Sequence, residues 1–70
     1  MIEYDYYSPR INEHIKVEAP DIETLKDYIR IYSEWRDSLR CKCELWHRLQ
    51  AFVDAYEETL DSLRGCENAI

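Results

Sequence analysis

The chain has 70 residues, of which 46% are hydrophobic, and its formal net charge is −6. A chain of this length makes one small domain with a marginal core, so the high apolar content predicts association with a second copy or with another protein. The acidic balance argues against direct binding of nucleic acid, because proteins that bind it are usually basic. The charge is uneven: residues 1–27 hold seven acidic and three basic residues, residues 28–50 three and five, and residues 51–70 five and one.

The cysteines and the N-terminus bear on the cellular compartment. Cys41 and Cys43 lie too close for a comfortable disulfide within a helix, and the total of three cysteines is odd, so we expect reduced thiols. No hydrophobic run is long enough to span a bilayer, and Met1 is followed at once by acidic residues and tyrosines rather than by a signal peptide. We therefore expect a cytoplasmic protein with no membrane partner, in the host cell if the protein is viral.

Residues 1–20 are expected to form an N-terminal arm. Apolar residues alternate with acidic ones at its start, as in a short extended segment: Ile2, Tyr4 and Tyr6. Ser8 followed by Pro9 is typical of a helix start, and Ile11 and Ile15 lie four apart, so a short helix near 9–17 is predicted. We expect the arm to lie across the main helix of its own or a partner chain, with a loosely ordered tail as the alternative.

The main element is expected over residues 21–65, followed by a tail at 66–70. Asp21 can cap its start and Gly65 can end it, and no Gly or Pro occurs from Ile22 to Arg64. Apolar residues recur there every seven, which indicates helices that pack on helices. The first set of heptad positions is Leu25, Tyr32, Leu39, Trp46, Val53 and Leu60, and the second is Tyr28, Trp35, Lys42, Leu49, Tyr56 and Leu63.

The pattern predicts an all-α fold. We expect one long helix over about 22–64, because no residue from Ser38 to Cys43 is a strong helix breaker and the heptad phase continues through this stretch. A break near 38–43, which would give a helical hairpin, is the alternative. The wide apolar stripe favours a bundle of three or more helices, so we expect a dimeric helical bundle or coiled coil.

No cofactor, metal or catalytic residue is predicted. Cys43 and His47 lie one helical turn apart, but the spacing of Cys41 and Cys43 does not suit one ion on a helix, and a structural zinc needs four ligands. The chain has no Gly-rich loop, nucleophile elbow or His-Glu-x-x-His pattern. The sequence therefore predicts a protein that is not an enzyme.

Aromatic and arginine residues are the best candidates for a protein interface, because these types dominate interface energetics. The predicted interface residues are Tyr4, Tyr6, Tyr7, Arg10, Tyr28, Tyr32, Trp35, Arg36, Leu39, Trp46, Leu49, Val53 and Tyr56. For the two tryptophans a purely structural place in the core is the competing interpretation. A second candidate is an acidic patch of Asp54, Glu57, Glu58 and Asp61, on successive helical turns.

Function follows from these features only as a hypothesis, since no motif identifies a family. The leading interpretation is a small acidic protein that binds itself and another protein, as an inhibitor, adaptor or small chaperone, and occludes a surface of its partner. A virus or mobile element is the expected source. One alternative is an acidic mimic of nucleic acid that blocks a DNA- or RNA-binding protein. Another is a structural assembly subunit.

Overall fold

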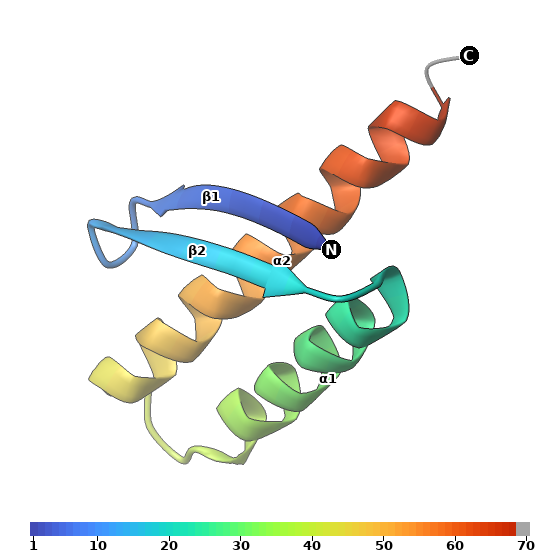
Figure 1. Cartoon of the computed structure of the whole chain (residues 1–70). Coiled ribbons are helices and arrows are strands. Elements are labelled where there is room, and N and C mark those ends of the chain that lie inside the picture. The colour runs from blue at the N-terminus through green and yellow to red at the C-terminus, as the bar shows by residue number, and fades with distance from the viewer. Residues whose placement is uncertain (69–70) are drawn as a thin grey trace.

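The protein is a small α+β domain, so the predicted all-α fold is wrong. The computed structural model describes residues 1–68, with side chains described through residue 63. Strand β1 (Ile2–Ser8) and strand β2 (Glu13–Ala19) precede helix α1 (Ile22–Ser38) and helix α2 (Glu44–Asn68). Figure 1 shows the two strands as a hairpin that crosses α2, with α1 beside α2 and antiparallel to it.

The N-terminal arm is a β-hairpin rather than a segment with a short helix. Its strands are antiparallel, with Tyr4 opposite Val17 and Tyr6 opposite Ile15. The prediction of a helix at 9–17 is wrong because the apolar residues of β2 recur every second position, which suits a strand whose one face is buried. Ser8 ends β1 as a buried residue instead of capping a helix.

The predicted single helix over 22–64 is also wrong, because the chain turns between residues 38 and 43, where the alternative placed a break. Asp21 caps α1 as expected, since its Oδ1 accepts from the backbone N–H of Thr24 at 2.7 Å. Leu39 takes an extended conformation, with φ −78° and ψ 133°, and ends α1. Helix α2 does not end at Gly65 but continues to Asn68.

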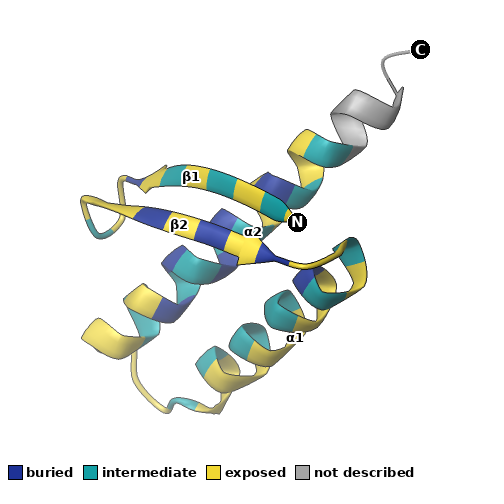
Figure 2. Ribbon diagram, in the orientation of Figure 1, coloured by how far each residue is buried: buried dark blue, intermediate teal, exposed yellow. Residues whose placement is uncertain are grey.

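The core lies between the hairpin and the two helices. Three alternate residues of β2 are buried there against one residue of α1 and two alanines of α2: Ile15, Val17 and Ala19 with Leu25, and Ala51 and Ala55. Figure 2 shows this burial on β2 and along α2, whereas α1 is mostly half-buried or exposed.

The coiled-coil and helical-bundle predictions are therefore wrong. Ala51 and Ala55 fall outside both heptad sets, yet both are fully buried against the hairpin. Small residues allow a strand to approach a helix closely, whereas a heptad seam would leave this face to solvent. Helix α2 buries one face against the hairpin and another against α1, and a two-stranded coiled coil would use only one.

Candidate functional site

A stack of aromatic rings joins the two helices. The Tyr32 ring of α1 stacks on two rings of α2, with centroid distances of 5.5 Å to Tyr56 and 5.7 Å to Phe52. The Tyr32 ring also stacks on Trp35 of its own helix, at 6.3 Å. The rings of Tyr28 and Tyr56 lie 5.7 Å apart and extend the stack toward the start of α1. Contacts of this kind are favourable beyond the area that they bury.

The two helices that the stack joins also expose large apolar side chains. Ile31 and Trp35 lie one turn apart on α1 and keep 48% and 47% of their surface exposed, and Leu45 on α2 keeps 41%. Leu45 precedes Phe52 by seven residues, so both lie on one stripe of α2. We call these three side chains, together with the Tyr32 ring of α1 and the Phe52 ring of α2, the helix-pair surface.

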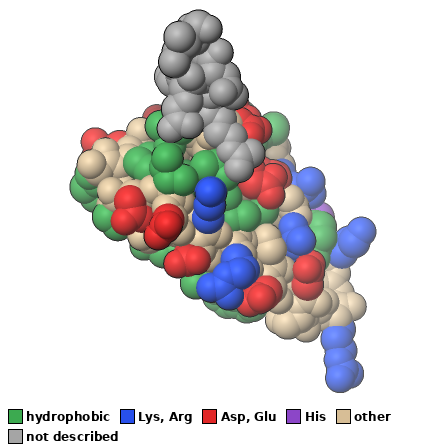
Figure 3. All heavy atoms as spheres, turned by 90° about the vertical axis from the view of Figure 1, so that its right-hand side faces the viewer, with side chains coloured by type: hydrophobic (Ala, Val, Ile, Leu, Met, Phe, Trp, Pro, Cys, Tyr) green, Lys and Arg blue, Asp and Glu red, His purple; other side chains and the backbone are tan. Residues whose placement is uncertain are grey.

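Charged and apolar side chains are mixed on one face of the molecule. On the face that Figure 3 presents, hydrophobic side chains appear between acidic and basic ones, and no single sign of charge covers the whole face. A surface of mixed charge with apolar area between the charges suits contact with protein better than a field of one sign, which would steer a highly charged ligand.

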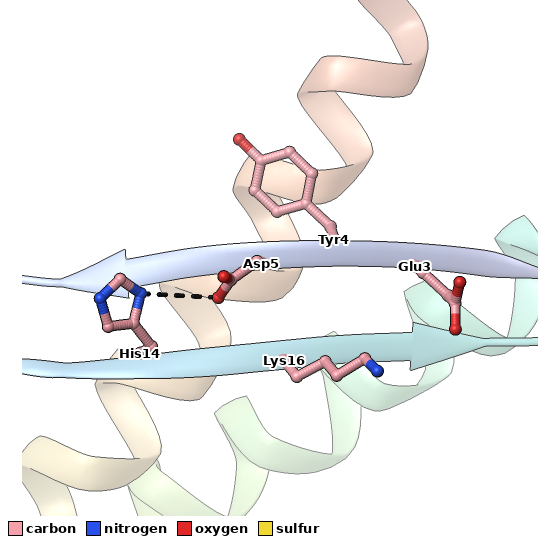
Figure 4. A pocket seen from close by; sticks show the side chains of 5 residues that line it. All are labelled: Glu3, Tyr4, Asp5, His14 and Lys16. Carbon is pink, nitrogen blue, oxygen red and sulfur yellow. Dashed lines mark ion pairs between the residues drawn. The ribbon is translucent and has the colours of Figure 1, made fainter.

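The outer face of the hairpin holds a shallow polar hollow. Figure 4 shows Glu3 and Asp5 of β1 beside His14 and Lys16 of β2, with Tyr4 lining the same hollow. His14 Nδ1 lies 3.6 Å from Asp5 Oδ1, and Lys16 Nζ lies 3.2 Å from a carboxylate oxygen of Glu18, which raises the pKa of Lys16. These exposed pairs are the usual cross-strand and same-face contacts of a two-stranded sheet.

A second hollow lies where the hairpin turn meets the first turns of α2, lined by Arg10, Ile11, Glu13, Glu44, His47 and Arg48. Arg48 lies within 3.9 Å of carboxylates on both elements. The Arg10 guanidinium lies 3.4 Å from His47 Nδ1 and 3.9 Å from a carboxylate oxygen of Asp54. These contacts hold the hairpin on α2, so the basic groups are already engaged within the chain.

Burial changes the pKa of two tyrosines at these contacts. Burial, helped by neighbouring Tyr32 and Tyr28, raises the pKa of Tyr56 to about 12. Burial and then the carboxylates of Asp54 and Glu58 raise the pKa of Tyr6. Both phenols therefore stay neutral at physiological pH, and neither is poised as a general base.

The predicted interface residues divide into several groups. Leu49 and Val53 are buried, and Tyr4, Tyr6, Tyr28, Tyr32, Arg36, Leu39, Trp46 and Tyr56 are half-buried. The structure brings Arg10 to Trp46, with the guanidinium carbon 5.9 Å from the ring centroid, and Lys42 Nζ lies 5.3 Å from the same ring. Arg36 donates to Gln50 Oε1 at 2.6 Å. Of the predicted set, Trp35 and Tyr7 are the apolar members that remain largely exposed.

The four residues of the predicted acidic patch are not equivalent. Asp54 is half-buried and interacts with Arg10, and its Oδ1 accepts from Gln50 Nε2 at 2.8 Å. Glu57, Glu58 and Asp61 are exposed. Because Asp54 belongs to the contact between hairpin and helix, the patch is not a uniform row of solvent-facing carboxylates.

The predicted interface left out three members of the helix-pair surface, Ile31, Leu45 and Phe52. Their signal in the sequence was their place beside the heptad seam, where all three widen the apolar stripe. The exposed thiols of Cys41 and Cys43 were set aside because a helix was expected there. The two cysteines lie instead in the loop between α1 and α2, so helical geometry does not apply to them.

Comparisons with protein-family models, curated proteins and solved structures find no match to this chain. Among the residues that the structure describes, no group of three or more His, Cys, Asp or Glu side chains is placed to hold a metal ion. Neither helix, over its described part, combines the length and the apolar character that crossing a bilayer requires.

Proposed function

We propose that the protein is a non-enzymatic, protein-binding protein whose helix-pair surface covers part of a partner. The observation that carries the proposal is the exposure of Ile31, Trp35 and Leu45, each between 41% and 48%, on the two helices that the aromatic stack joins. Covering exposed apolar side chains is favourable. Tryptophan is also among the residues that contribute most to binding energy at interfaces.

The size of the surface favours a short partner segment. Each of the three exposed side chains has on the order of 100 Å² left to bury. Their combined area is well below the ~800 Å² that each partner buries in a typical stable interface. One amphipathic helix, which presents apolar residues three, four and seven positions apart, fits such an area. We therefore propose an apolar helix of another protein as the occupant, consistent with an inhibitor, adaptor or small chaperone.

The two hollows support a binding role over a catalytic one. Their charged side chains are engaged with one another. Asp5 pairs with His14 across the hairpin, and Arg48 of α2 pairs with Glu13 of the hairpin and with Glu44 of its own helix. Neither hollow presents a nucleophile beside a base that a third group orients, which is the arrangement that nucleophilic catalysis uses.

Selection from a displayed library of random peptides, with the intact chain as bait, tests the proposal. We expect selected peptides to carry apolar residues at helical spacing. Trp35→Ala should weaken their binding at least tenfold, because a central aromatic anchor typically contributes more than about 1.4 kcal/mol. Tyr7→Ala is the matched control, because Tyr7 is also 47% exposed but lies on the outer face of the hairpin.

Two results would contradict the proposal. One is a set of peptides that bind Trp35→Ala and the parent equally well. The other is a dimer, detected by light scattering, that dissociates in Trp35→Asp, because a second copy would then occupy the helix-pair surface. Circular dichroism on each variant checks that the fold is retained, so that lost binding is not mistaken for lost structure.

A further inference from the structure

The loop between the two helices carries two exposed thiols. Helix α1 ends at Ser38 and α2 begins at Glu44, so Cys41 and Cys43 lie in a five-residue connection without helical geometry. Both cysteines are free and exposed. In a helix, residues two apart point to different sides, but in a loop both side chains can turn to the same side.

The two thiols are close enough to interact. After the backbone N–H of Trp46, the neighbouring Cys41 thiol is the next cause that lowers the pKa of the Cys43 thiol. Cα atoms two positions apart are at most about 7 Å from each other, whereas a disulfide requires about 4.4–6.8 Å. Because these two ranges overlap, the spacing of Cys41 and Cys43 within a loop permits a bridge between them.

Cys43 occupies the favourable position for the attacking group. It directly precedes α2, and its carbonyl oxygen accepts from the His47 N–H at 3.1 Å. The backbone N–H of Trp46, then the neighbouring Cys41 thiol and the backbone N–H of Leu45, lower the pKa of the Cys43 thiol. A thiolate at a helix N-terminus is stabilised by the same unpaired N–H groups that bind anions there.

A metal is the competing use for such a pair. Zinc sites in proteins use at least three protein ligands, and within the described residues no cluster of three His, Cys, Asp or Glu side chains is present. The nearby His47 is engaged by Arg10 through Nδ1. Among the side chains that the structure describes, the arrangement provides two thiols and no third ligand, which suits chemistry between two sulfurs.

We propose that Cys41 and Cys43 form a thiol–disulfide exchange site for small or peptide disulfides, with Cys43 as the attacking thiol and Cys41 as the resolving thiol. The Cys43 thiolate attacks one sulfur of a substrate disulfide such as glutathione disulfide, forms a mixed disulfide and releases one glutathione thiolate. Cys41 gives its proton to solvent and attacks the Cys43 sulfur, which breaks the mixed disulfide and releases the second glutathione thiolate. The protein pair loses two electrons, and the glutathione disulfide gains them.

Incubation of the intact Cys66→Ser chain with glutathione disulfide at pH 7, followed by mass spectrometry, tests this inference. The expected product has lost two hydrogens and carries no glutathione, because Cys41 resolves the adduct. Cys41→Ser in the same background should retain one glutathione on Cys43. Cys43→Ser should react several-fold more slowly, because Cys41 then acts without the donors at the helix start.

The linkage can also be mapped in the unsubstituted chain, so the test does not depend on how Cys66→Ser folds. Trypsin cleaves after Arg40, Lys42 and Arg48, so the Cys41–Cys43 bridge would join residues 41–42 to residues 43–48. Finding this linked pair, reversed by a dithiol reductant, supports the site. A stable glutathione adduct on the parent, equal rates for the two single variants, or bridges only between chains would overturn it.

Discussion

The ring of Tyr32 lies 5.5 Å from the ring of Tyr56, with only 16° between their planes, and so joins α1 to α2. In sequence these residues are 24 positions apart, on opposite sides of a loop with no glycine or proline. The contact explains why the chain turns there. Folding α1 back on α2 covers rings that a single straight helix would leave in water.

Replacing Tyr32 with Ala should destabilise the protein by about 2 kcal/mol, because the ring stacks on Tyr56, Phe52 and Trp35 at once. Tyr32→Phe keeps the ring and should cost less than about 1 kcal/mol. Urea unfolding followed by circular dichroism measures both. Equal losses for the two variants would mean that the Tyr32 hydroxyl, rather than the stacked ring, stabilises the helical pair.

The contact between Tyr32 and Tyr56 also predicts a dependence of stability on alkaline pH. The pKa of Tyr56 rises from its ordinary value of 10.0 to about 12, chiefly through burial. Below about pH 10 the phenol is neutral in both the folded and the unfolded chain, so it adds no pH dependence. Between about pH 10 and 12 the unfolded chain loses this proton first, so the free energy of unfolding falls as pH rises.

The measurement is the free energy of unfolding in urea from pH 8 to pH 12 for the parent and for Tyr56→Phe. The free energy of unfolding of Tyr56→Phe should fall less over the upper part of this range, because the variant lacks the phenol that resists ionisation. Tyr7→Phe, which changes a tyrosine on the outer face of the hairpin, should follow the parent. Curves of the parent and Tyr56→Phe that stay parallel to pH 12 would show that Tyr56 ionises equally in both states.

The hairpin's position on α2 depends on small side chains. Ala51 and Ala55 are fully buried where β2 packs on α2, so a larger residue has no room without moving a strand. Ala51→Leu or Ala55→Leu should therefore cost about 1–3 kcal/mol. Ser62→Leu, at an exposed position of the same helix, should change stability by less than about 0.5 kcal/mol. Thermal and urea unfolding compare them, and a neutral Ala55→Leu would contradict this packing.

These alanines mark the limit of what the sequence could predict. The heptad spacing identified Leu25, Leu49 and Val53, which are buried as a helical interface requires. The second buried face of α2 is built from alanines, which give little hydrophobic signal in the sequence. The loop of five residues also preserves the seven-residue spacing between Leu39 and Trp46. The heptad pattern therefore gives no sign that the chain turns there.

The sequence predicted only part of the hairpin, for a similar reason. The alternation of Ile2, Tyr4 and Tyr6 correctly indicated an extended segment, which is β1. The spacing of four between Ile11 and Ile15 fits a period of two as well as one turn of helix, and the helical interpretation was wrong. The exposed thiols of the loop could not be recognised as a pair, because their place in a loop depends on the end of α1 at Ser38.

The hairpin turn depends on a residue in the left-handed region. Asn12 has φ 56°, a conformation that Gly and Asn adopt at low cost and that β-branched residues avoid. Its Oδ1 also accepts a hydrogen bond from the Tyr7 hydroxyl on the strand before the turn. Sequence reasoning missed this turn because Pro9 was interpreted as the start of a helix instead of part of a tight connection.

Asn12→Val should destabilise the protein by about 1–2 kcal/mol. At this positive φ angle the branched side chain of valine clashes with the backbone. Asn12→Gly should stay within about 0.5 kcal/mol of the parent, since glycine takes the left-handed angle freely and the lost hydrogen bond is exposed. Urea unfolding provides both values. If Asn12→Gly were as costly as Asn12→Val, the side-chain bond to Tyr7, and not the backbone angle, would determine the stability of the turn.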